Sequence, residues 1–184
     1  MNNKLSKKVF AEMMETLNAY YVNFKVDLDN QLVVNVWYRA FENFDDKTFK
    51  DMILNYCTNN IYAPQSPTHI IEITFNKLLE SQMGSTEAFN KIIEWWADDN
   101  ISNDKLIRNI ADINEALLQT FNDMRLSHIG RYAKITDDFT KNQLKKEFIE
   151  SYEKNLKNFI RGCIQKGNLL LGDTSILKIG SDGK

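Results

Sequence analysis

The sequence is poor in the residues that make turns, cross-links and metal sites. Among its 184 residues there are 2 prolines, 7 glycines, 2 cysteines and 2 histidines. So few prolines and glycines argue against β-sandwiches and barrels, which need closely spaced turns. The two cysteines, Cys57 and Cys163, lie far apart in apolar helical patterns. We therefore expect two reduced, buried thiols, as in a cytosolic protein.

The sequence also lacks a long apolar run and a dominant charge. No stretch approaches the ~20 apolar residues that a membrane-spanning helix needs, and no apolar core follows the N-terminal lysines as it would in a signal peptide. The formal net charge is −2, which excludes a global basic field for nucleic acid. Asn, Lys and Ile are abundant, as in low-GC bacteria and their phages. The expected location is the cytoplasm of a bacterial host cell, with no membrane partner.

Motifs that support catalysis are missing as well. Neither G-x-x-x-x-G-K-[ST] nor G-x-G-x-x-G occurs. His69 is expected to be a surface or capping residue, and His128 has no Cys, Asp or Glu at metal-ligand spacing. The acidic pairs at residues 45–46, 98–99 and 137–138 fall at predicted helix ends, where we attribute them to the helix dipole. We predict no enzyme, no catalytic or metal-binding residue and no cofactor.

Apolar residues recur every three or four positions through most of the chain, which predicts an all-α fold. The first 80 residues are expected to form a bundle of about four short helices. Ser6, Asp29 and the pair Asp45-Asp46 begin the first three, and a short extended connection follows the first at residues 21–24. The expected buried face of the second helix is Leu32, Val33, Val36, Trp37, Ala40 and Phe41, and that of the third is Phe49, Met52, Ile53, Tyr56 and Cys57.

Both prolines stand in residues 61–73, between the third and fourth helices. Proline cannot donate a backbone hydrogen bond and keeps the preceding residue out of the helix, so the third helix should end near Asn59 or Asn60. Ser66 is a suitable N-cap for a fourth helix that begins at Pro67 and ends near residue 80. Its expected inward residues are Ile70, Ile71, Phe75, Leu78 and Leu79.

A second helical region is predicted after a polar stretch. The expected domain limits are an N-terminal bundle at residues 1–80, a linker at 81–86, a C-terminal helical region at 87–167 and a flexible tail at 168–184. Helices are expected at 87–97, 102–110 and 112–124, and residues 125–134 should be irregular. The last helix, capped by Thr136 and followed by Gly167, should be the longest. Its expected buried face is Leu144, Phe148, Tyr152, Leu156, Phe159 or Ile160, and Cys163.

Two surfaces near the C-terminus are candidates for partner contact. Residues 141–184 contain 9 basic and 5 acidic side chains. The candidates for contact with nucleic acid or an acidic partner are Lys145, Lys146, Arg161 and Lys166, and the competing interpretation is a solvated face of mixed charge. The tail contains two apolar clusters, whose candidate partner-binding residues are Leu169, Leu170, Leu171, Ile176 and Leu177. This tail either docks on a partner or packs back on the domain.

Residues 1–80 also contain a series of short motifs in a definite order. They are Tyr20-Tyr21-Val22-Asn23-Phe24, then Val36-Trp37-Tyr38, Phe41-Glu42-Asn43-Phe44-Asp45, Tyr56-Cys57-Thr58-Asn59-Asn60, and the proline segment with its Ile70-Ile71-Glu72-Ile73. This order resembles the phage replicative-helicase loader-and-inhibitor family. Val22 stands where a proline is usual in that family, and Pro64 and Pro67 are separated where the family has adjacent prolines.

The resemblance implies an all-helical adaptor that binds the DnaB-type replicative helicase or its loader. Such an adaptor acts stoichiometrically as a loader or inhibitor without hydrolysing ATP, with the phage origin-binding protein as a further partner. The missing nucleotide-binding loop agrees with this role. Two alternatives stay open. One is a DNA-binding replication or regulatory protein that uses the basic last helix, and the other is a phage inhibitor of other host machinery.

Overall fold

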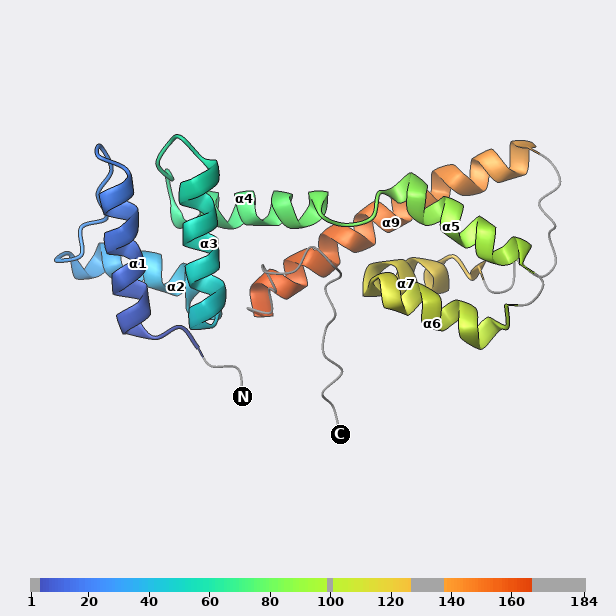
Figure 1. The fold of residues 1–184 in the computed structure, drawn as a ribbon, viewed down its shortest axis with the longest axis horizontal. Coiled ribbons are helices and arrows are strands. Elements are labelled where there is room, and N and C mark those ends of the chain that lie inside the picture. The colour runs from blue at the N-terminus through green and yellow to red at the C-terminus, as the bar shows by residue number, and fades with distance from the viewer. Residues whose placement is uncertain (1–3, 99–100, 127–137, 167–184) are drawn as a thin grey trace. The chain divides into compact units, whose positions relative to one another are not determined.

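The computed structural model describes residues 4–98, 101–126 and 138–166. Every regular element in these ranges is a helix, which confirms the predicted all-α class (Figure 1). The helices are α1 (Lys7–Tyr20), α2 (Gln31–Phe41), α3 (Asp46–Asn59), α4 (Pro67–Glu80), α5 (Ser85–Ala97), α6 (Asn103–Ile113), α7 (Glu115–Asp123) and α9 (Asp138–Lys166).

The described residues form two compact units. The first comprises residues 4–78 and 161–166, and the second comprises residues 79–98, 101–126 and 138–160. Helix α9 therefore contributes its last turns to the first unit and the rest of its length to the second. The domain limits drawn from the sequence stay a prediction, and the tail at 168–184 lies outside the described residues.

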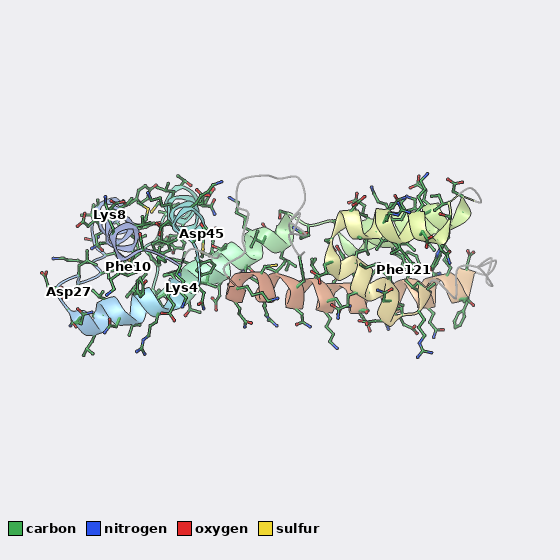
Figure 2. All side chains as sticks on the ribbon, turned by 90° about the horizontal axis from the view of Figure 1, so that it is seen from below. Lys4, Lys8, Phe10, Asp27, Asp45 and Phe121 are labelled. Carbon is green, nitrogen blue, oxygen red and sulfur yellow. The ribbon has the colours of Figure 1, made fainter. Side chains whose placement is uncertain are left out.

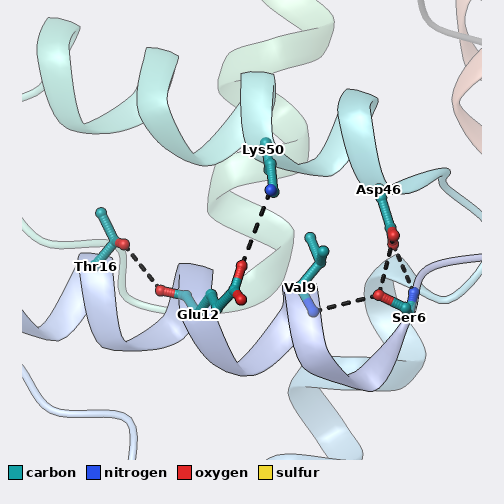
Figure 3. Close-up of polar contacts among 6 residues, drawn as sticks. All are labelled: Ser6, Val9, Glu12, Thr16, Asp46 and Lys50. Carbon is teal, nitrogen blue, oxygen red and sulfur yellow. Dashed lines mark hydrogen bonds and ion pairs between the residues drawn. The ribbon is translucent and has the colours of Figure 1, made fainter.

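Helices α1 and α3 are held together at their N-terminal ends by polar contacts (Figure 3). Ser6 caps α1, because its Oγ accepts a hydrogen bond from the backbone N–H of Val9 at 3.3 Å. The carboxylate of Asp46 accepts hydrogen bonds from Ser6 N at 2.7 Å and from Ser6 Oγ at 3.0 Å. One turn further along, Lys50 and Glu12 form an ion pair at 3.9 Å. The N-termini of α1 and α3 thus lie side by side, and the caps predicted at Ser6 and Asp45 are confirmed.

Aromatic rings fill the core of the first unit. The ring of Phe10 stacks on that of Phe49 at 5.9 Å, and the rings of Phe41 and Phe49 are 4.9 Å apart (Figure 2 labels Phe10). All five predicted core residues of α3 are buried, which confirms that face. Full burial of one such side chain contributes about 1.5–3 kcal/mol, so this cluster is the main source of stability in the unit.

Two expectations for α2 were wrong. Its N-cap is Asn30, whose side chain accepts from Leu32 N and Val33 N, because Asp29 N–H is bonded to Asp27 Oδ1 in the preceding turn. The helix buries Trp37 and Phe41 and leaves Leu32 and Val36 exposed. A helix with apolar residues around more than one side can place only one side against the core.

The connection after α1 is a turn, where we expected an extended segment. Phe24 N–H donates to Tyr21 O at 3.0 Å. The side chain of Asn18 then fixes the returning chain, since it accepts from Val26 N at 2.7 Å and donates to Val26 O at 2.9 Å. This paired amide contact replaces the strand-like pairing that an extended segment would have needed.

The proline segment has the predicted form. Helix α3 ends at Asn59, α4 begins at Pro67, and Ser66 Oγ accepts from His69 N at 3.3 Å. Helix α4 buries Pro67, Ile70, Thr74 and Leu78. The other predicted inward residues, Ile71, Phe75 and Leu79, are half-buried, because α4 has neighbours on only part of its surface.

The second unit is built around α9, whose described face agrees with the prediction. The predicted residues Leu144, Phe148, Tyr152, Leu156 and Cys163 are all buried, and Ile160 is the buried member of the pair 159–160. Phe148 packs against Phe89 of α5 at 5.4 Å. Phe121 of α7 is also buried, with its ring 6.5 Å from that of Trp96 (Figure 2). Thr136, Gly167 and residues 127–134 lie outside the described residues.

Three predicted boundaries in this unit were shifted. Helix α5 begins at Ser85, two residues earlier than expected, with Gly84 as its N-cap. The break between α6 and α7 falls at Asn114, where the side-chain Oδ1 accepts from Leu117 N at 2.8 Å and Nδ2 donates to Tyr152 OH at 3.0 Å. Asp98 is the C-cap of α5, so dipole complementarity does not explain its position.

Candidate partner-binding surface

Four large apolar side chains are exposed where α1 and α3 end. Val22 is 93% exposed, Ile61 90%, Tyr62 82% and Tyr20 53%. We call these four residues the tip patch. They come from the turn after α1 and from the proline segment after α3, two stretches about forty residues apart in sequence. Large exposed apolar groups in one place are a usual mark of a binding surface.

Buried tyrosines support the tip patch from below. Tyr21 OH donates to Asn60 O at 2.8 Å, and Tyr56 OH donates to Tyr62 O at 3.2 Å. The Tyr21 and Tyr56 rings meet edge to face at 6.2 Å, and the Tyr20 ring lies 5.0 Å from that of Tyr21. Burial raises the pKa of Tyr21 to about 12 and also raises the pKa of Tyr56. The hydroxyls therefore stay neutral and tie the two helix ends together.

The proline segment explains why Ile61 and Tyr62 are exposed. Because Pro64 and Pro67 end one helix and begin the next, the residues between Asn59 and Pro67 cannot bury side chains on a helical face. His69 closes this turn: its Nδ1 lies 3.4 Å from Gln65 N and 3.4 Å from Tyr56 Oη, and its ring packs edge-on to Tyr56 at 5.7 Å. The expected capping role of His69 agrees with this position.

A second surface of the first unit is a groove with a volume of about 490 Å³. Helices α2, α4 and the last turns of α9 border it. Its lining residues all belong to the first unit, and they are Ala40, Asn43, Phe44, Ile71, Glu72, Phe75, Arg161, Ile164 and Gln165. The guanidinium carbon of Arg161 lies 5.7 Å from the centre of the Phe75 ring, a cation–π contact that holds this cation at the groove.

Two exposed residues of α2 extend the groove. Leu32 is 77% exposed and Val36 is 63% exposed. They stand eight and four residues before Ala40, so all three lie on one side of α2. We call Leu32 and Val36 the α2 stripe. The stripe gives the groove an open apolar approach.

The predicted basic residues of α9 are divided between two units and several directions. Lys145 and Lys146 belong to the second unit, and Arg161 and Lys166 belong to the first. At about 100° per residue, Lys145 and Arg161 point about 160° apart around the helix axis, and Lys166 points about 140° from Arg161. They do not form a single basic stripe along α9. The predicted tail residues Leu169, Leu170, Leu171, Ile176 and Leu177 lie outside the described residues.

The described residues offer little reactive chemistry. No group of three or more His, Cys, Asp or Glu side chains among them is arranged to hold a metal ion. Cys57 and Cys163 are free and buried, as predicted, and burial raises the pKa of the Cys57 thiol. No helix in the described ranges is long and apolar enough to cross a membrane. His128 lies outside these ranges.

The sequence contained only one signal for the tip patch. Ile61 and Tyr62 stand between a predicted helix end and Pro64, where no helical face is available to bury them. Tyr20 was expected on the buried face of α1, because it continues the helical spacing of Leu17. It is exposed because α1 ends there and Tyr21 takes the buried position beside Tyr56.

Comparison with known proteins identifies the N-terminal part of the chain. We found no match to the chain among curated proteins or among solved structures. Residues 6–68, about a third of the chain, match the family model for the N-terminal domain of the phage SPP1 helicase loader/inhibitor protein. This range runs from the N-cap of α1 to the second residue of α4 and includes the whole tip patch. Residues 6–68 therefore form an N-terminal domain of the phage helicase loader-and-inhibitor family, which confirms the resemblance seen in the sequence.

Proposed function

We propose that this protein is a phage replication adaptor that binds the DnaB-type replicative helicase of the host, or the loader of that helicase. It acts stoichiometrically as a loader or inhibitor in the host cytoplasm, without hydrolysing ATP, and the phage origin-binding protein is a further partner. The observation that best supports this function is the loader/inhibitor N-terminal domain with an exposed apolar patch on a rigid base.

The tip patch has the chemistry of a protein-binding surface. It combines two tyrosines with two aliphatic residues, and tyrosine is among the residues enriched at interface hot spots. Its backbone is fixed by the hydrogen bonds of Tyr21 and Tyr56 and by two prolines, so little conformational entropy is lost on binding. We therefore propose that Ile61 and Tyr62 are central contacts to the helicase or its loader.

Binding measurements with purified partners test this function. The full chain is titrated against the host helicase and, separately, against its loader, in the absence of nucleotide. We expect micromolar or tighter binding to one of them. Ile61→Asp should weaken that binding at least about tenfold, equivalent to about 1.4 kcal/mol, because it places a charge in a desolvated contact.

Phe139→Asp is the matched control. Phe139 is 79% exposed in the second unit, so the same kind of substitution there should leave affinity unchanged. Absence of binding to either partner at micromolar concentration would refute the proposed function. Equal losses in both variants would refute the role of the tip patch.

A DNA-binding function is less well supported. The four predicted basic residues do not share one face of α9, and Arg161 is engaged with the Phe75 ring. Salt-dependent DNA binding needs several cations that reach phosphates together. We therefore propose no second function.

A further inference from the structure

The groove of the first unit is large and apolar enough to hold side chains. Its volume of about 490 Å³ is about three times that of a cavity of ~150 Å³ that binds benzene. Ile71 and Phe75 of α4 are only half-buried beside it, although their neighbours Ile70 and Thr74 are fully buried. Several leucine-sized groups would complete the burial of these two residues.

The chain itself supplies such groups next to the groove. Ile164 and Gln165, in the last described turn of α9, line the groove. Leu169, Leu170 and Leu171 follow only three to five residues after Lys166. At about 3.4 Å per extended residue, these leucines can reach about 10–17 Å from the end of the described helix. Gly167, directly after Lys166, allows a sharp change of chain direction.

We propose that Leu169, Leu170 and Leu171 fold back into this groove and pack on Ala40, Ile71 and Phe75. A short tether gives these leucines an effective concentration of about 1 mM at the groove. A free partner at cellular concentration would compete poorly against such a local supply. The intramolecular segment is therefore the occupant that the position of the helix end favours.

This contact concerns the free protein, and it holds whether or not the tip patch binds a helicase. It resolves the two roles that the sequence left open for this apolar cluster in favour of packing on the domain. Any partner contact by the same leucines then requires their release from the groove. The two roles become competing states of one segment.

Methyl-labelled nuclear magnetic resonance of the full chain tests the proposal. In the wild type we expect nuclear Overhauser effects from the methyls of Leu169, Leu170 or Leu171 to those of Ala40 and Ile71 and to the Phe75 ring. Leu170→Asp should abolish these effects, because it charges the segment that enters the groove. It should leave the methyl signals of the α1–α3 core unchanged.

Substitutions on the groove side provide the matched pair. Ala40→Glu places a carboxylate in the groove and should also abolish the effects, whereas Asn35→Glu, on an exposed part of α2 away from the groove lining, should preserve them. Unchanged α1–α3 core signals show that each variant is folded. The proposal is overturned if the wild-type leucines show no effects to the groove, or if Ala40→Glu and Leu170→Asp both leave those effects intact.

Discussion

Tyr21 joins the ends of α1 and α3 through a hydrogen bond from its hydroxyl to Asn60 O at 2.8 Å. Burial raises its pKa to about 12 from the ordinary value of 10.0. The folded state therefore disfavours the ionised form. The resulting stability is fully present below pH 10 and is lost as the pH rises from about 10 to about 12.

Replacing Tyr21 with phenylalanine should make stability less sensitive to alkaline pH. We expect the urea midpoint of the wild type to fall more steeply between about pH 9 and about pH 11.5 than that of Tyr21→Phe. A residual slope remains, because burial also raises the pKa of Tyr56 and Tyr152. At neutral pH the variant should lose about 0.5–1.5 kcal/mol from the missing hydrogen bond. Equal alkaline slopes in both proteins would show that Tyr21 does not resist ionisation.

Asn114 is a second residue whose removal should be costly. It is buried, it caps α7 through Leu117 N, and it donates to Tyr152 OH. Asn114→Ala should destabilise the protein by about 1–3 kcal/mol in urea unfolding, because it leaves buried polar groups unpaired. Tyr152→Phe removes only the hydroxyl and should cost less. A loss below about 0.5 kcal/mol for Asn114→Ala would contradict this role.

At the scale of elements, apolar spacing predicted where most helices lie. Helices α1, α3 and α4 have the expected caps, because Ser6, Asp45 and Ser66 stand directly before an apolar pattern. Spacing failed where two polar residues compete for one role. Asp29 and Asn30 are both good N-caps, and the tertiary position of the preceding turn decides between them.

Helix α2 also shows the limit of a pattern read from one helix. Its residues Leu32, Val36, Trp37 and Phe41 are all apolar, yet only Trp37 and Phe41 are buried. The choice depends on the partners that the fold places beside it, namely Phe24 and the Phe44–Phe49 cluster. No pattern within α2 contains that information.

Substitutions in α2 should separate its two sides. Leu32→Asp and Val36→Asp should each change the free energy of unfolding by no more than about 0.5 kcal/mol, as expected for exposed positions. Phe41→Ala should cost about 3–5 kcal/mol, since it empties a fully buried site. Urea unfolding of the three variants gives the comparison. A large loss for Leu32→Asp would mean that this residue is buried in the protein.

For the molecule as a whole, the candidate surfaces depended on contacts between distant segments. The groove combines residues 40–44, 71–75 and 161–165, and no local pattern connects segments so far apart. The tip patch likewise joins residues 20–22 with 61–62. The sequence did predict the family of the N-terminal part, because its aromatic and proline motifs are local and keep their order.

Light scattering of the protein mixed with its partner is the most direct test of nucleotide-independent binding to the host helicase or its loader. After size-exclusion separation without ATP, we expect the mass of the helicase or loader peak to increase by whole multiples of 21.5 kDa. Ile61→Asp should reduce that increase at the same concentrations. The result that would contradict the proposed function is elution of the wild-type chain at its own mass beside both unmodified partners.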